Sequence, residues 1–174
     1  EYPAGIREAI LEMESLPSYN NGDGTVILTD NQENPVDLFD YEEDYHLSLL
    51  NSVKGVSLER ISFTRPTNDP GNWTSAAENV GFASPGYQNS LYNPEGRAGS
   101  GFELESDVFS PDNDGFQDVL LLNYLLNTPG NFVTIFVYDR RGREVFQMAY
   151  IVLLGTEGTL SWDGVLENGT KARI

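Results

Sequence analysis

The sequence has no cysteine and a single histidine, His46, among its 174 residues. The lack of cysteine excludes disulfides, cysteine-ligated zinc and a thiol nucleophile. With one imidazole, the chain cannot by itself supply a site that needs two histidines. No apolar run approaches the ~20 residues that a helix needs to cross a bilayer, so the sequence predicts no membrane-spanning helix.

Basic residues are also few, because ten Lys and Arg stand against 27 Asp and Glu, a formal net charge of −17. Proteins that hold a phosphate backbone present a positively charged face, so this balance argues against nucleic acid as a partner. The same acidity favours solubility and attracts cations, calcium among them.

The composition favours strands over helices. Aromatic residues make up 11% of the chain, and it contains 17 Gly and 9 Pro, which is typical of short strands joined by many turns. A length of 174 residues suits one or two small domains, and 39% hydrophobic content is enough for packed cores. We therefore expect an all-β fold.

The first half of the chain combines a few short strands with a long irregular segment. The apolar spacing over residues 6–16 predicts a short amphipathic helix. Strands are expected at residues 25–29, 35–40 and 57–63, the first two forming a hairpin. Little periodicity follows over residues 64–92, which predicts a long loop. Residues 93–101 are rich in Gly, Ser and Pro and are expected to be a linker.

The second half shows more regular strand patterns. Strands are expected at residues 119–126, 132–138, 143–150 and 159–162. Residues 139–142, Asp-Arg-Arg-Gly, predict the turn between the second and third of these strands. Strands at this spacing favour an antiparallel sandwich over a parallel sheet.

Several strings in the first half match a known family. They are Gly-Thr-Val-Ile-Leu-Thr (24–29), Gly-Val-Ser-Leu-Glu-Arg-Ile (55–61), Pro-Thr-Asn-Asp-Pro (66–70), Asn-Trp (72–73), Ser-Ala-Ala (75–77) and Pro-Gly-Tyr (85–87). Together they resemble the bacterial lamin-tail domain. The resemblance implies an immunoglobulin-like β-sandwich over residues 1–92. The family's opening strands, which usually precede a segment like residues 4–16, are not visible, so we expect the sequence to begin inside the domain.

A second set of strings lies in the other half. They are Phe-Ser-Pro-Asp-Asn-Asp-Gly (109–115), Asp118, Val-Tyr-Asp-Arg-Arg-Gly (137–142), Val-Phe (145–146), Trp-Asp-Gly (162–164) and Asn-Gly (168–169). This set resembles the C-terminal immunoglobulin-like modules of exported Bacteroidetes proteins, related to the gliding-motility and hook-capping immunoglobulin-like domains. The resemblance implies a second β-sandwich over residues 102–174, without the family's last strand. It also implies a secreted or surface-attached protein, sometimes one handled by the type IX secretion machinery.

The sequence around residues 112–118 is the best candidate for metal chemistry. Carboxylates of Asp112, Asp114 and Asp118, with the carbonyl of Phe116, are hard oxygen ligands of the kind that calcium prefers, and Gly115 permits a sharp turn. The segment is shorter than an EF-hand loop and lacks a Glu at the expected twelfth position. The alternative is a turn in which the Asp side chains accept backbone hydrogen bonds.

Other candidate residues favour structural roles. The carboxylates at Asp37, Asp40, Glu42, Glu43 and Asp44 predict a solvated acidic edge rather than a cation site. Two carboxylates across a cleft would also suit a glycosidase, but acidic residues are so common here that any such pair carries little information. Trp73 and Trp162 can stack on sugars, although packing is the expected role of each. His46 is likewise expected to be structural.

These observations predict a non-enzymatic module. The chain shows no grouped nucleophile, base and orienting residue, and the resemblances point outside the cytoplasm, to a secreted, outer-membrane or periplasmic location. We expect a structural or adhesive segment of a larger bacterial surface protein that contacts protein or cell-surface polysaccharide. The alternatives are a calcium-dependent carbohydrate- or protein-binding accessory module, a C-terminal secretion or anchoring element, and a hydrolase that uses acidic residues.

Overall fold

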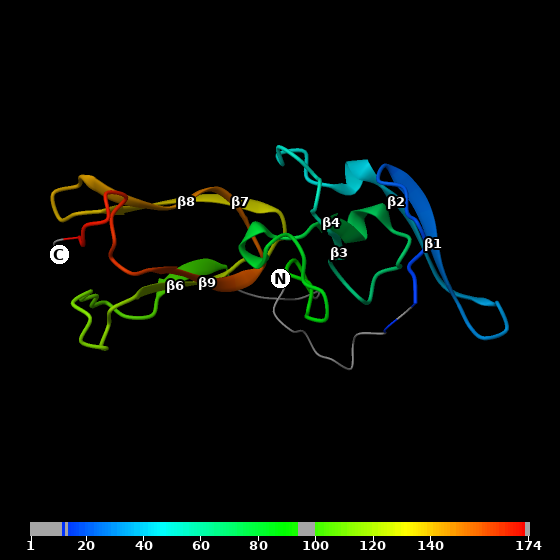
Figure 1. Cartoon of the computed structure of the whole chain (residues 1–174), viewed down its shortest axis with the longest axis horizontal. Coiled ribbons are helices and arrows are strands. Elements are labelled where there is room, and N and C mark those ends of the chain that lie inside the picture. The colour runs from blue at the N-terminus through cyan, green and yellow to red at the C-terminus, as the bar shows by residue number, and fades with distance from the viewer. Residues whose placement is uncertain (1–11, 13, 94–99, 173–174) are drawn as a thin grey trace. The chain divides into compact units, whose positions relative to one another are not determined.

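The computed structural model describes residues 12, 14–93 and 100–172 (Figure 1). Over this part of the chain the strands are antiparallel, and the only helices are single 3-10 turns. The all-β prediction is therefore confirmed. The helix predicted over residues 6–16 falls almost wholly outside the described residues. No helix in the described ranges is long and apolar enough to cross a membrane.

The chain divides into two compact units, Glu1–Arg97 and Ala98–Ile174. The point of division lies in the segment 93–101 that the composition marks as a linker, of which residues 94–99 are outside the described part. Each unit has its own strands and its own buried residues.

The first unit begins with the hairpin expected from the sequence. Strands β1 (Asp23–Thr29) and β2 (Pro35–Glu42) pair antiparallel. The turn between them is held by Asp30, whose carboxylate accepts hydrogen bonds from the backbone N–H groups of Gln32 at 2.8 Å and Asn34 at 2.9 Å. A short polar side chain that bonds the backbone two residues ahead is a common way to set such a turn.

One face of this hairpin packs against the rest of the unit through aromatic rings. Phe39 of β2 stacks on Trp73, with ring centroids 3.8 Å apart and planes inclined by 21°. Tyr45, in the single-turn helix η2 (Glu43–Tyr45), lies beside the same Phe39 ring. Because strand side chains alternate, this contact fixes which face of the hairpin is turned inward.

A second, shorter pair of strands follows. Strand β3 (Leu58–Arg60) pairs antiparallel with β4 (Trp73–Ser75). The strand predicted at 57–63 is thus only three residues long, and the predicted loop at 64–92 contains a strand that the sequence analysis missed. The segment also contains the single-turn helices η3 (Pro70–Asn72) and η4 (Glu78–Val80). The strand ends early because, from Ser62 onward, a side chain takes over the bonding of the backbone.

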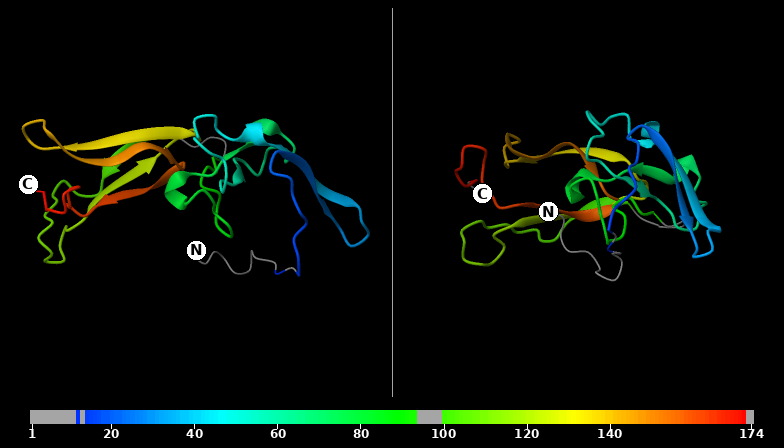
Figure 2. Two further views of the ribbon diagram at one scale, coloured as in Figure 1. Left: turned by 45° about the horizontal axis from the view of Figure 1, so that its top comes forward. Right: turned by 45° about the vertical axis from the view of Figure 1, so that its right-hand side comes forward.

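The second unit contains two antiparallel sheets (Figure 2). One has the order β5 (Gly101–Leu104), β6 (Leu120–Leu125), β9 (Glu157–Trp162), and the other is the pair β7 (Asn131–Tyr138) and β8 (Glu144–Leu154). The sequence prediction is confirmed for β6, β7, β8 and β9 and for the turn between β7 and β8. Strand β5 was missed because it begins at the glycine-rich linker and is exposed throughout.

The core of the second unit is apolar and aromatic. Tyr124, Leu126 and Leu154 form its buried centre, with the partly buried Val133, Val152 and Leu160 packed against them. Nearer the other end, Trp162 is 5% exposed and stacks on Phe146 with centroids 4.9 Å apart. Strands of both sheets contribute to these contacts, so the sheets pack on each other through this core.

Candidate functional sites: a braced loop and an acidic turn

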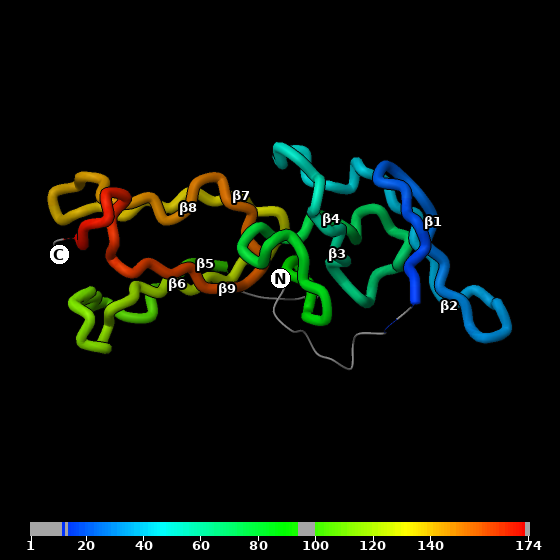
Figure 3. The backbone as a smooth tube through the Cα atoms, in the orientation of Figure 1, coloured from blue at the N-terminus to red at the C-terminus, as the bar shows by residue number. Residues whose placement is uncertain are grey.

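The chain between β3 and β4 forms a loop (Figure 3). It is organised around the side chain of Asn72, which is fully buried. Its Oδ1 accepts a hydrogen bond from the backbone N–H of Ser62 at 2.9 Å, and its Nδ2 donates to the Ser62 carbonyl at 2.9 Å. Nδ2 also lies 3.2 Å from the carbonyl of Pro66. One amide thus replaces the strand partner that Ser62 lacks, which explains the short β3.

Two arginines complete the bracing of the same loop. Arg60 donates to the carbonyls of Ser62 and Arg65, at 3.0 and 2.5 Å. Arg65 pairs with Asp69 at 2.7 Å and donates to the carbonyl of Gly71 at 3.0 Å. A partly exposed ion pair of this kind adds little stability by itself, but the carbonyl contacts fix the loop's course. Both guanidinium groups are therefore occupied by their own loop.

Glu59, in β3, is a carboxylate buried to 4% exposure. It accepts hydrogen bonds from the hydroxyl of Ser84, from the backbone N–H of Ser90 at 2.7 Å and from the hydroxyl of Ser90 at 2.6 Å. The Ser90 hydroxyl in turn accepts from the backbone N–H of Ala77 at 2.9 Å. Each donor to the carboxylate is neutral, so hydrogen bonds alone offset the cost of its burial. Glu59 thereby ties residues 77–90 to β3.

A serine and the histidine form a third buried contact. Nδ1 of His46 lies 3.0 Å from the hydroxyl of Ser75, which also accepts the backbone N–H of Leu47 at 2.9 Å. Since Ser75 is fully buried, its proton needs an acceptor, and the imidazole Nδ1 provides one. Burial lowers the pKa of His46, against the opposing effect of Glu43. No substrate can reach a serine with 0% exposure, so this pair is structural.

The three aspartates proposed as metal ligands do come together. Oxygens of Asp112, Asp114 and Asp118 all lie within 4.8 Å of one another. The fourth predicted ligand, Phe116, has a side chain that is 68% exposed and a backbone N–H that donates to Asp114 at 2.8 Å. The structure thus places all four predicted residues in one turn.

Hydrogen bonds within this turn already engage the carboxylates. Both oxygens of Asp118 accept backbone N–H groups, from Asn113 at 2.5 Å and from Gly115 at 2.8 Å. Asp112 accepts the backbone N–H of Asp114 at 3.1 Å. Bonds of this kind are typical of turns in which Asp side chains replace backbone partners.

A cation from the same unit also contacts the acidic turn. The ammonium of Lys171 donates to the carbonyl of Pro111 at 2.5 Å and to Oδ1 of Asn113 at 2.7 Å. The bonds observed here are those of the hydrogen-bonded turn that the sequence offers as the alternative to a calcium loop.

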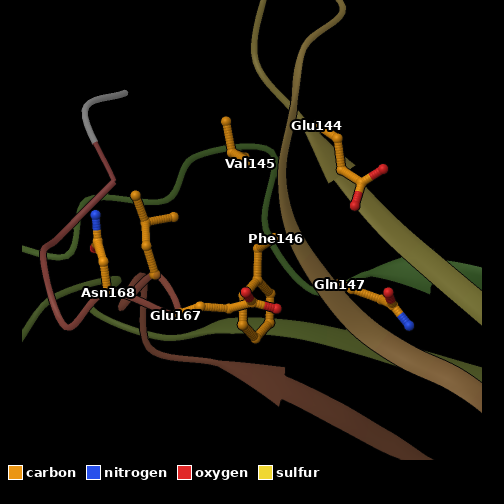
Figure 4. Close-up of a pocket in the computed structure, with 7 residues that line it drawn as sticks. Glu144, Val145, Phe146, Gln147, Glu167 and Asn168 are labelled. Carbon is orange, nitrogen blue, oxygen red and sulfur yellow. The ribbon is translucent and has the colours of Figure 1, made fainter.

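A groove at one end of the second unit contains two further carboxylates (Figure 4). It has a volume of about 340 Å³ and is lined on one side by residues 144–147 of β8 and on the other by residues 166–168. Glu144 and Glu167 come from these separate segments. Phe146, between them, is committed to the stack on Trp162.

The indole N–H groups of both tryptophans have structural partners. That of Trp73 donates to the carbonyl of Thr67 at 2.7 Å, and that of Trp162 to the carbonyl of Val165 at 2.8 Å. Each ring also stacks on a phenylalanine. These contacts match the packing role expected from the sequence.

No family model matches the chain, and the search found no similar curated protein and no similar solved structure. The resemblances to the lamin-tail domain and to exported immunoglobulin-like modules therefore stay predictions from the sequence strings.

The sequence analysis missed the groups that organise the first unit. Glu59 and Asn72 are polar residues at buried positions, and nothing in their immediate neighbours marks them as buried. The one available signal was the imperfect alternation of residues 57–63, in which Glu59 shares a strand face with apolar side chains.

Replacing the buried carboxylate tests its role in the loop. Glu59→Ala leaves the Ser90 N–H and two hydroxyls without their acceptor, so we expect it to lower the free energy of unfolding by about 2–4 kcal/mol. Glu59→Gln is the matched control and should cost less, because its carbonyl can serve Ser90 while its amide donates to Ser84. Urea titrations followed by Trp73 fluorescence in a Trp162→Phe background measure both. Equal losses in the two variants would contradict this account.

The acidic turn is tested with calcium itself. Because backbone N–H groups and Lys171 already satisfy the turn, we expect the same melting temperature for the full chain in excess calcium chloride and in excess chelator. A ligand that binds only the folded state raises the melting temperature. A higher value in calcium, lost in the double variant Asp112→Ala and Asp114→Ala, would instead establish a calcium site.

Proposed function

We propose that this chain is a non-enzymatic interaction module of a larger bacterial surface or secreted protein, acting outside the cytoplasm as a structural or adhesive element. The observation that carries the proposal is the bracing of residues 61–93. Buried Asn72 and Glu59 hold long loops in one conformation, as a surface that recognises a partner requires.

Exposed aromatic side chains on this braced segment support the proposal. Phe63 is 59% exposed and stacks on Tyr92, with centroids 5.1 Å apart, and Tyr87 is 45% exposed. Aromatic residues on a fixed backbone lose little conformational entropy when they bind, so they are frequent energetic centres of interfaces. Their partner is proposed to be a protein or a cell-surface polysaccharide.

The architecture agrees with this function. Small antiparallel sheets joined by long loops suit a pair of immunoglobulin-like modules, which is the finer fold that we propose for the two units. The sequence strings that resemble lamin-tail domains and exported C-terminal modules support the proposed location outside the cytoplasm.

The proposed function is tested on cells of the organism that makes this protein. Antibody labelling of intact cells should detect the natural protein at the surface, and added protease should remove that signal. Labelled full chain is then added to cells that lack the gene, and bound protein is counted. We expect Phe63→Ser with Tyr87→Ser to lower binding by about tenfold, because these aromatic rings are removed from the contact surface.

Tyr150→Ser is the matched control, since Tyr150 is an exposed aromatic of the second unit, at 65% exposure. It should bind as the unchanged chain does. A cytoplasmic location, equal binding of the two kinds of variant, or turnover of a substrate by the purified chain would each contradict the proposed function.

A further inference from the structure

The two edges of the β1–β2 hairpin differ. Along β2, backbone N–H groups that point away from β1 are bonded to side chains: that of Asp40 donates to Oδ1 of Asn68 at 2.7 Å, and that of Leu38 to Oδ1 of Asp37 at 3.0 Å. Asn68 also donates to the Asp40 carboxylate at 2.9 Å. The β2 edge is therefore closed by its own unit, a common protection of sheet edges.

Along β1 the corresponding backbone groups have no partner among the described residues of this unit. Thr25 lies opposite Asp40 and Ile27 opposite Leu38. In an antiparallel pair, two directly opposed residues either bond to each other through their N–H and C=O groups or both point these groups away from the partner strand. Thr25 and Ile27 thus point their backbone groups away from β2, and their N–H groups have no hydrogen-bond acceptor within residues 14–93.

The outward face of the hairpin carries apolar side chains beside acidic ones. Because Phe39 faces Trp73, residues at the alternate positions face away from it. These include the cross-strand pair Ile27 and Leu38, and Ile27 is 51% exposed. Figures 1 and 2 show the tip of the hairpin projecting beyond the β3–β4 part of its own unit.

The charge of the hairpin limits the choice of occupant. From Asp23 to Glu42 the sequence contains no Lys or Arg and six acidic residues, namely Asp23, Asp30, Glu33, Asp37, Asp40 and Glu42. Asp23 and Glu42 lie directly opposite each other, an arrangement of like charges that a cation would relieve. A second copy of this chain would bring six more carboxylates to the same edge, so charge disfavours self-pairing.

We propose that β1 accepts an extended, basic segment of a protein partner as an added strand. The partner's backbone pairs with Thr25 and Ile27, its apolar side chains cover Ile27, and its Lys or Arg side chains lie near Asp23 and Glu42. In strand addition, main-chain bonds give affinity and alternate side chains give specificity. The inference rests on the proposed function as an interaction module and names the chemistry of one partner.

Two synthetic peptides of about eight residues, the length of an ordinary strand, test the proposal. Both place valine and a charged residue in turn along one strand face, with threonine at the positions between them; one carries lysine and the other glutamate as the charged residue. The lysine peptide should bind the full chain and slow the hydrogen exchange of the Thr25 and Ile27 amides. The glutamate peptide should do neither, and added salt should weaken the binding of the lysine peptide.

Variants at Ile27 separate the backbone from the side chain. Ile27→Pro removes the outward N–H without removing a β1–β2 ladder bond, whereas Ile27→Ala removes a similar amount of side chain and keeps the N–H. We expect proline to weaken binding of the lysine peptide at least about tenfold relative to alanine. Asp23→Asn with Glu42→Gln, which leaves the backbone unchanged, should reduce both the affinity and its salt dependence. Melting curves check that each variant folds.

The proposal is overturned by any of several results. These are failure of the lysine peptide to bind, equal binding of the glutamate peptide, and equal binding by the proline and alanine variants. Protection of the Thr25 and Ile27 amides in the free chain would show that the chain covers this edge itself. A dimer lost in Ile27→Pro would make a second copy the occupant. Cell binding that fails while the lysine peptide still binds would refute the proposed function alone.

Discussion

Every polar group that the first unit buries must regain the hydrogen bonds it loses with water, and the segment from β3 onward is arranged around that requirement. Its buried polar residues are Glu59, Ser62, Asn72, Thr74 and Ser75, whereas its buried hydrophobic residues are Ala76, Ala77 and Leu91. Only Leu91 among these is a large apolar side chain, so apolar burial supplies little of this segment's transfer free energy. The hydrogen-bonded side chains therefore determine the course of the loops and the surface that these loops present.

The second unit follows the opposite principle. Its centre is formed by Tyr124, Leu126 and Leu154, and Trp162 is held between aromatic rings. In a unit packed in this way, the hydrophobic side chains that face the core determine the register of the strands. The acidic turn at residues 112–118 lies outside this core and is bonded largely within itself. One chain thus combines a unit organised by polar bonds with a unit organised by apolar contacts.

This contrast explains what the sequence could predict. Apolar runs and alternation beside clear turns correctly indicated β1, β2, β6, β7, β8 and β9. They missed β4, whose three residues are too few for a period, and β5, which is exposed throughout. The proximity of the three aspartates followed from their local spacing. The bonds from Asn72 to Ser62 and from Glu59 to Ser90 join residues 10 and 31 positions apart, and no local pattern encodes such pairs.

Hydrogen exchange of two amides tests the polar organisation of the first unit most directly. The N–H of Ser62 donates to Asn72 and that of Ser90 to Glu59, so neither is protected by a strand ladder. If these side chains hold the loops as described, both amides should exchange within about tenfold of the rates of Val26 and Phe39 in the β1–β2 ladder. Exchange as fast as that of the exposed turn amide of Asn31, for which no bond is found among the described residues, would contradict the account.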